Sequence, residues 1–468
     1  MVTKLSRRAV LAAALSLPAA RLWGQDAGLA QRPPTRPIPD AAELVAASRL
    51  RGTVGYALLD NRGTLLDGAL ASEPLPPAST MKVLTALYAL ARLGPDHRFR
   101  TRVVRAADML VLVGGGDPIL SSDDLETLAA DLVASGQTSP ARFAVWGGAL
   151  PRLTEIVPDQ PDHLAYNPAV SGMILNFNRV HLGWRHVGGG LQMRLEARAA
   201  ANSPRAYTIT AQPVDQRNLF TYRADDRVEH WTVARSALAR PGSRWLPVRR
   251  PELYAGDVFQ TLCRAKGLVL PSPEVIDVMP AGDEVAAHGS QRLDRILRDM
   301  LYYSTNLTAE VVGLHASGAR DPAASARRMQ GWFRDQGLGD GFDLADHSGL
   351  SDASRVTAEG LARAIQSAAG AAELGALLKR DPLSDDLGAP VSQSYEVAAK
   401  TGTLNFVSNL AGHLDKDGRQ GVFAILCTDQ PRHIATSGTD LPAGVRGWTR
   451  EAKTLQRRLL ASWAQRYL

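Results

Sequence analysis

The sequence predicts an α/β domain, built from helices and an antiparallel sheet, that is interrupted by a large β-rich insertion. Both ends of the 468-residue chain combine helical spacing of apolar residues with strand-like segments. Residues 98–280 instead contain short alternating segments broken by glycine and proline, which favours β structure. A chain of this length has room for about two to four domains. We therefore expect residues 31–97 and 281–468 to form two parts of one domain, with residues 98–280 inserted between them.

The first part of the split domain is predicted to begin with a helix and a hairpin. Residues 41–50 have helical spacing, and the apolar run 53–59 is followed by the turn sequence Asp-Asn-Arg-Gly and a second short apolar segment. A longer helix is predicted over residues 79–93, because apolar residues recur there at helical spacing and a Gly-Pro pair ends the pattern.

The second part alternates between the two kinds of structure. Helical spacing returns over residues 293–313 and again over 357–378. Three apolar segments then have the length and pattern of strands, at 395–400, 409–414 and 421–428, and the last two are joined across a turn that contains Gly418. A terminal helix is expected over residues 450–468, which completes the set of elements for a sheet covered by helices.

Composition and charge narrow the function classes. Apolar residues make up 45% of the chain and charged residues 21%, which is typical of a folded soluble protein and excludes wholesale disorder or a polytopic membrane protein. The net charge is +6, but four of the cations lie in residues 1–24, which contain no acidic residue, so that the rest of the chain carries only +2. No basic block occurs elsewhere, and we expect no nucleic-acid partner.

The N-terminal segment has the pattern of an export signal. Arg7 and Arg8 precede the apolar run Val10–Ala20, which is too short to span a bilayer as a mature helix. The paired arginines resemble a twin-arginine signal, but ordinary secretory signals also carry them, so the export route stays open. A proline-rich linker follows over residues 32–39. We expect a cleaved signal within residues 1–30; a retained anchor or an amphipathic helix is the alternative.

Lysine is scarce in this chain, and one lysine has a suggestive neighbour. Only seven of the 53 basic residues are lysines, and an ammonium can lose its proton when it is desolvated, whereas a guanidinium cannot. Ser79 and Lys82 lie three positions apart at the start of a predicted helix, so that hydroxyl and amine share one face. The pair could be a nucleophile and its base. Alternatively, Ser79 is a helix N-cap and Lys82 a surface residue.

Two further motifs follow along the chain. Lys400, Thr401, Gly402 and Thr403 end a predicted strand; on an exposed strand the lysine and hydroxyl groups could hold a carboxylate, and the glycine would leave room for a ligand along the edge. The tripeptide Ser304-Thr305-Asn306 offers a hydroxyl for proton relay and a carboxamide for holding an amide. Each motif alone is unspecific.

Together and in this order, S-x-x-K, S-x-N and K-T-G resemble the signature of the serine penicillin-binding proteins and class A β-lactamases. Four further features resemble one branch of these serine enzymes. They are the long gap between the first two motifs, the glycine-rich sequence at 114–118, the sequence 304–310 and the sequence 346–351. This is the class C low-molecular-mass branch, the D-alanyl-D-alanine carboxypeptidase/endopeptidase family of the penicillin-binding protein 4 type. The resemblance covers essentially the whole mature chain and implies a transpeptidase-like domain with two extra domains in the insertion.

The resemblance also implies a mechanism and a location. Lys82 would take the proton of Ser79, which attacks the penultimate D-Ala carbonyl of a peptidoglycan stem peptide. Ser304 would pass a proton to the departing amine, and Asn306 would position the acyl chain. The resemblance further implies the following substrate-binding roles: Lys400 and Thr401 for the terminal carboxylate, backbone N–H groups of Ser79 and Thr403 for the oxyanion, and Asp159 or Asp162 for the peptide side chain.

The implied partners are peptidoglycan peptides and, as inhibitors, β-lactam antibiotics. No metal or cofactor is required, and the place of action would be the periplasm or the cell wall. Two other functions remain open: a β-lactamase of the same fold, and a peptidoglycan-binding protein without catalysis. The sequence leaves undecided whether the enzyme is a carboxypeptidase or an endopeptidase, whether Cys263 and Cys427 pair, and whether the chain is a monomer or a dimer.

Overall fold

The computed structural model describes residues 38–158, 160–367, 374–390 and 393–468. The chain divides into two units, Met1–Ile38 and Pro39–Leu468, and every element described below lies in the second. Within the described ranges, no helix combines the length and apolarity needed to span a bilayer. The predicted export signal falls outside the described residues.

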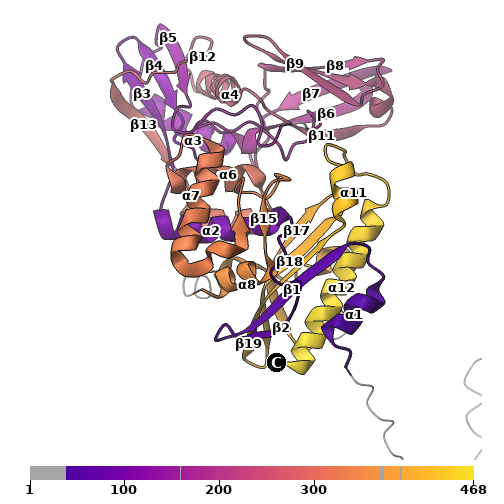
Figure 1. Cartoon of the computed structure of the whole chain (residues 1–468). Helices are drawn as coiled ribbons and strands as arrows, with labels where there is room; N and C mark the ends of the chain where they lie inside the picture. Colours follow the sequence, from indigo (N-terminus) through magenta and orange to yellow (C-terminus); the bar gives the residue numbers. More distant parts are fainter. Residues whose placement is uncertain (1–37, 159, 368–373, 391–392) are drawn as a thin grey trace, which may run out of the picture. The chain divides into compact units, whose positions relative to one another are not determined.

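A six-stranded antiparallel sheet unites the two ends of the chain (Figure 1). Its order is β16-β17-β18-β19-β1-β2. The strands are β1 (Thr53–Asp60), β2 (Leu65–Ala69), β16 (Lys379–Arg380), β17 (Glu396–Leu404), β18 (Val407–Lys416) and β19 (Arg419–Thr428). Thr53 pairs with Thr428 and Asp60 with Gly421, so the predicted N-terminal strand is adjacent to the last predicted strand.

Helices cover both faces of this sheet. Successive apolar side chains of a strand point to opposite faces, so each face needs helices to bury it. On β1, Tyr56 and Leu58 face one core, while Ala57 and Leu59 face the other. The first core is closed by α1 (Ala41–Ser48) and α12 (Val445–Arg466), which lie side by side in Figure 1. The second core is closed by α2 (Met81–Leu93), α5 (Leu293–Tyr303), α6 (Asn306–Ser317), α7 (Pro322–Phe333) and α8 (Ala358–Gln366).

The insertion contains three sheets. A five-stranded mixed sheet has the order β12-β5-β4-β3-β13, and two three-stranded sheets have the orders β8-β10-β9 and β11-β6-β7. Their strands are β3 (Arg100–Ala106), β4 (Met109–Val113), β5 (Arg142–Trp146), β6 (Arg179–Val187), β7 (Gly190–Glu196), β8 (Ile209–Val214), β9 (Phe220–Ala224), β10 (Glu229–Ala234), β11 (Gly242–Pro247), β12 (Glu274–Val275) and β13 (Asp283–Gly289).

The insertion also contains two helices that alternation of apolar residues does not predict. They are α3 (Ser122–Ala134), which a capping box from Ser121 opens, and α4 (Pro251–Ala265), which has proline at its first position. Strand β13 pairs with β3, so the inserted sheet continues to Gly289, beyond the expected boundary at 280. The division into domains remains our proposal.

Short elements complete the described part of the chain. They are η1 (Ala78–Thr80), η2 (Asn176–Asn178), η3 (Arg235–Leu238), η4 (Arg334–Leu338), η5 (Gly339–Gly341), β14 (Phe342–Asp343), β15 (Arg355–Val356), α10 (Ser384–Leu387) and α11 (Gln430–Ala435). The predicted helix over 357–378 corresponds to α8, and part of its second half lies outside the described residues. Cys263 and Cys427 are free, buried thiols in two different cores, so they do not form the disulfide left open above.

Candidate active site

Ser79 lies in a tight turn that leads into α2. It belongs to η1, and the N-cap of α2 is Thr80, which makes no side-chain capping bond. Ala78, just before the serine, has φ of 45°, a conformation that costs a residue with a side chain roughly 1–3 kcal/mol. A side chain on Gly349 would lie 1.8 Å from the Ala78 carbonyl oxygen, so the loop at Gly349 packs directly against this turn. Ser79 is therefore not an N-cap, and the turn leaves it half-buried at the edge of a cavity.

Lys82 is completely buried one turn after Ser79. Its Nζ lies 2.9 Å from Ser79 Oγ, 2.8 Å from Asn306 Oδ1 and 2.7 Å from the carbonyl oxygen of Ser348. The interpretation of Lys82 as a surface residue is therefore wrong. The Lys82 amine has three hydrogen-bond partners, and one of them is the Ser79 hydroxyl, as the sequence motif predicts.

These three contacts decide where a proton can move. Burial lowers the pKa of Lys82 from 10.5 to about 7, and the carboxyl groups of Asp346 and Glu310 oppose part of this shift. A neutral amine has two N–H groups and one lone pair. Because Asn306 Oδ1 and the Ser348 carbonyl can only accept hydrogen bonds, the lone pair faces Ser79, which alone of the three has a proton to give. The geometry thus fits a nucleophile beside a general base.

The S-x-N motif brings its two polar side chains to the same cavity. Ser304 ends α5 in the left-handed conformation, with φ of 61°, and Asn306 begins α6. Both residues line the cavity. Asn306 also donates from Nδ2 to the carbonyl oxygen of Tyr166, at 3.0 Å, in the insertion. Asn306 therefore connects Lys82 with the inserted part of the chain, a contact that the motif alone does not predict.

The K-T-G segment lies differently from our expectation. Lys400 is 3% exposed and donates from Nζ to the Thr401 carbonyl oxygen, at 2.8 Å. Burial, followed by the nearby charges of Lys82 and two other lysines, holds the pKa of Lys400 well below its usual range. Thr403 is exposed and lines the cavity. The expectation of an exposed strand is correct for Thr403 and wrong for Lys400, which is buried and is not among the residues that line the cavity.

The space beside Gly402 is occupied by the backbone of the turn that carries Ser79, and it is not open to a ligand. A side chain there would lie 2.9 Å from the Pro77 carbonyl oxygen, 3.0 Å from Thr80 N and 3.1 Å from Ser79 N. The strand β17 can therefore approach the Ser79 turn closely only because residue 402 lacks a Cβ. Asn409 on β18 fixes the same turn, donating to the carbonyl oxygens of Pro76 and Pro77 at 2.8 and 2.9 Å.

We predict that Gly402→Ala separates β17 from the Ser79 turn and slows acylation of Ser79. The added methyl group would overlap backbone atoms that cannot rotate away, and such overpacking costs typically about 1–3 kcal/mol. The acylation rate constant, measured with a chromogenic β-lactam, should fall at least tenfold. Gly289→Ala, at the end of β13, with open space around it and no left-handed backbone conformation, is the control. An unchanged rate in Gly402→Ala would show that the close approach is unimportant.

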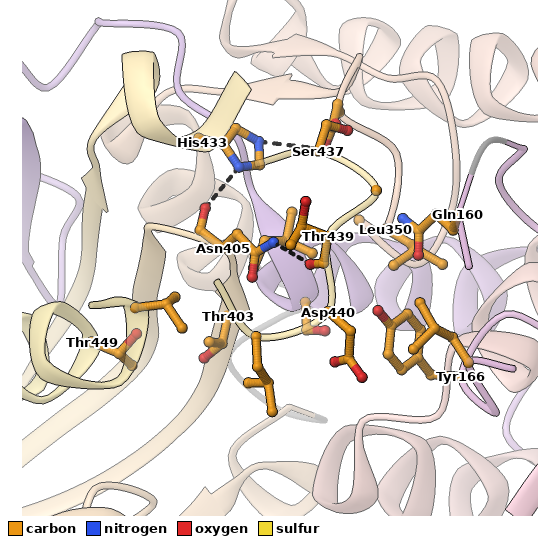
Figure 2. A pocket seen from close by; sticks show the side chains of 18 of the residues that line it. Gln160, Tyr166, Leu350, Thr403, Asn405, His433, Ser437, Thr439, Asp440 and Thr449 are labelled. Atoms are coloured by element: carbon orange, nitrogen blue, oxygen red, sulfur yellow. Dashed lines mark hydrogen bonds and ion pairs between the residues drawn. The ribbon is translucent and has the colours of Figure 1, made fainter. Parts of the chain in front are cut away.

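Ser79, Ser304, Asn306 and Thr403 open into one cavity of about 600 Å³. Figure 2 shows Gln160 and Tyr166 of the insertion on one side of it and Thr403 on the other. Helix α11 and the loop after it form a further wall. His433 of α11 bonds to the Asn405 carbonyl oxygen at 2.8 Å, and Asn405 donates to the Thr439 carbonyl oxygen in the loop at 2.8 Å. Of the two acidic candidates in the insertion, Asp159 lies outside the described residues and Asp162 is not among the lining residues.

Sequence motifs did not assign a role to three residues that contact the site. The carbonyl of Ser348 and the carboxylate of Glu310 belong to stretches that resemble the family. Nothing in their residue types indicates that the Ser348 carbonyl binds Lys82 or that Glu310 binds the Ser348 backbone. Asn409 carries no sequence signal at all.

The profile of the D-Ala-D-Ala carboxypeptidase 3 (S13) family matches residues 43–450. The chain belongs to this family. It is therefore a serine-type hydrolase of the D-Ala-D-Ala carboxypeptidase class that acts on peptidoglycan peptides, and the sequence-based prediction of family and function class is confirmed.

Individual relatives of this S13 chain agree with that assignment. A D-alanyl-D-alanine carboxypeptidase of Actinomadura sp. (strain R39) is 28% identical over 81% of this chain and 78% of its own length. A carboxypeptidase of Mycobacterium tuberculosis is 27% identical over 86% of this chain and 83% of its own. The crystal structure of penicillin-binding protein 4 from Haemophilus influenzae shares the fold, with a TM-score of 0.72, 18% identity and coverage of 90% and 99%. The predicted fold class is thus confirmed.

Proposed function

We propose that this S13 enzyme cleaves the D-Ala-D-Ala bond of stem peptides through an acyl-enzyme on Ser79. The observation that carries the proposal is the position of Lys82 Nζ, because Ser79 Oγ alone among its three hydrogen-bond partners can give a proton. Lys82 takes that proton while Ser79 Oγ forms a bond to the penultimate D-Ala carbonyl carbon. The negative charge passes to the carbonyl oxygen, which the backbone N–H groups of Ser79 and Thr403 stabilise.

The intermediate then collapses to the acyl-enzyme. The bond to the terminal D-Ala nitrogen breaks, and the proton held by Lys82 reaches this nitrogen through Ser304, which lines the same cavity. Asn306 holds the acyl chain. Thr401 and Thr403 bind the terminal carboxylate, and the negative charge of this carboxylate favours the protonated form of Lys400 on the same strand. Water attacks the ester in the second half-reaction and frees Ser79.

We further infer that β-lactams acylate the same serine and that the protein works outside the cytoplasm. The fold shared with penicillin-binding protein 4 from Haemophilus influenzae, which has also been solved with a β-lactam bound, supports the first inference. The paired arginines and the short apolar run near the N-terminus support export.

Product analysis with defined substrates tests the proposed function. The protein is incubated with a synthetic stem pentapeptide that ends in D-Ala-D-Ala and, separately, with a cross-linked muropeptide dimer. We expect free D-Ala from the first, and hydrolysis of the second if the enzyme is also an endopeptidase. Cleavage of neither substrate together with rapid hydrolysis of benzylpenicillin would instead identify a β-lactamase. No reaction with any of the three would identify a binding protein.

A further inference from the structure

One of the three contacts of Lys82 is a backbone carbonyl, which must be held in place by other groups. Ser348 lies in the loop between β14 and β15, and its carbonyl oxygen accepts from Lys82 Nζ at 2.7 Å. A loop carbonyl has no fixed direction of its own. Its orientation depends on what binds the peptide groups on either side of it.

Glu310 binds these peptide groups. Its carboxylate accepts from the backbone N–H of Ser348, at 2.9 Å, and of His347, at 3.2 and 3.3 Å. Glu310 follows Asn306 by four positions on α6, so that both side chains lie on one face of the helix. This face of α6 therefore acts on Lys82 in two ways. Asn306 contacts the amine directly, and Glu310 acts indirectly, by binding the peptide group of Ser348 whose carbonyl accepts from the amine.

The rest of the loop at His347 is equally constrained. Thr85, three positions after Lys82 on α2, donates to the His347 carbonyl oxygen at 2.6 Å. The His347 ring contacts Ser325 Oγ at 2.6 Å and packs on the backbone of Gly313, where a Cβ would lie 2.2 Å from the ring. Burial lowers the pKa of His347 to about 3 and keeps this ring neutral. These contacts fix the loop on both sides of the peptide group whose Ser348 carbonyl accepts from Lys82.

We propose that Glu310 is a positioning residue that holds the Ser348 carbonyl against Lys82 and supplies a negative charge near the amine. This inference rests on the proposed function, in which Lys82 takes the proton of Ser79. Glu310 is 4% exposed, and no arginine, lysine or histidine forms a salt bridge with it among the residues that the structure describes. The backbone N–H groups of His347 and Ser348 that donate to its carboxylate favour the ionised form, whose negative charge stabilises the ammonium that forms when Lys82 takes the proton.

The sign of the expected effect follows from the charged groups around Lys82. Asp346, from the loop, and Glu310 raise the pKa of Lys82, and the charge of Lys82 in turn lowers the pKa of Lys400 on β17. Burial and the charge of Asp346 raise the pKa of Glu310 itself, and the loop N–H groups that donate to its carboxylate oppose this shift. Glutamine at position 310 is neutral at every pH, so the variant lacks the negative charge of the ionised Glu310. The pKa of Lys82 should then fall, and the pH at which the amine becomes neutral should move lower.

The test compares Glu310→Gln with a matched variant elsewhere. Glu229 in the insertion is also buried and also accepts from two consecutive backbone N–H groups, those of Arg249 and Arg250. We expect Glu310→Gln to lower the maximal acylation rate by about ten- to a hundredfold, the size of effect known for small misplacement of reacting groups, and to move the midpoint of its pH profile downward. Glu229→Gln should lower the melting temperature without moving the midpoint.

A direct titration of Lys82 separates this inference from the proposed function. The chain has seven lysines, so the ¹³Cε resonance of Lys82 can be assigned by its loss in Lys82→Arg. The pH midpoint at which this resonance shifts should be lower in Glu310→Gln than in the wild type, whether or not Ser79 can be acylated. An unchanged midpoint would overturn the inference. A wild type that is never acylated would contradict only the proposed function.

Glu310→Asp guards against a glutamine variant that does not fold. Aspartate keeps the charge but withdraws the carboxylate from the backbone N–H groups of His347 and Ser348. In Glu310→Asp we expect the titration midpoint of Lys82 to stay close to that of the wild type and the acylation of Ser79 to be slower. A wild-type rate in Glu310→Asp would overturn the positioning role.

Discussion

Ser79→Ala should abolish covalent binding of benzylpenicillin. The wild-type protein should gain the mass of one intact drug molecule, because Ser79 Oγ opens the lactam ring and no atom leaves. Alanine has no nucleophile, and removal of a catalytic serine costs on the order of a millionfold in turnover. We therefore also expect D-Ala release by Ser79→Ala to fall to background. Intact-mass spectrometry of both proteins checks the adduct, and chromatography of free D-Ala checks the turnover.

The matched control is Ser121→Ala. Ser121 is a true N-cap: its side chain accepts from the Asp124 backbone N–H at the start of α3 in the insertion. Its loss should cost about 1 kcal/mol of stability and leave the adduct unchanged. An adduct of full yield in Ser79→Ala would place the nucleophile elsewhere.

Lys82→Arg should inactivate the enzyme although it preserves a positive charge. A guanidinium does not lose its proton in proteins, so that Ser79 would lack a base. The larger planar head also has to fit among the acceptors Asn306 Oδ1 and the Ser348 carbonyl, in a site that is completely buried. We expect the acylation rate constant to fall by at least about a thousandfold, the lower part of the range for removing a catalytic base. Stopped-flow measurement with a chromogenic β-lactam would show it.

Lys266→Arg provides the comparison. Lys266 lies in the insertion and pairs with Glu126, and arginine can make the same ion pair. Its acylation rate should equal that of the wild type. If Lys82→Arg retained more than a tenth of the wild-type rate, Lys82 would not be the base.

The local part of the site could be predicted from sequence because it depends on spacing. Ser79 and Lys82 are three positions apart, and a helical turn is enough to bring them together. The fold class was equally accessible, since apolar periodicity marks the strands and helices of the split domain. The helices α3 and α4 were missed because the glycine- and proline-rich sequence around them suggested strands throughout.

The remainder of the site depends on contacts between distant residues. Asn306 and Ser348 reach Lys82 across 224 and 266 positions, and no local pattern reports such contacts. The exposure of Lys400 was misjudged for the same reason: whether the side chain of a strand residue is buried depends on what packs against that face. At Gly402 the sequence suggested a glycine that leaves room for a ligand. In the structure the backbone of the Ser79 turn fills that space.

The pH dependence of Ser79 acylation tests the central claim, that a buried neutral Lys82 activates Ser79. Acylation requires the neutral amine, whose pKa is lowered to about 7 by burial, so the rate constant for the wild type should rise with pH and level off above a midpoint near pH 7. A rate that is independent of pH between 5 and 9, or one that still rises steeply toward the ordinary lysine value of 10.5, would contradict the claim.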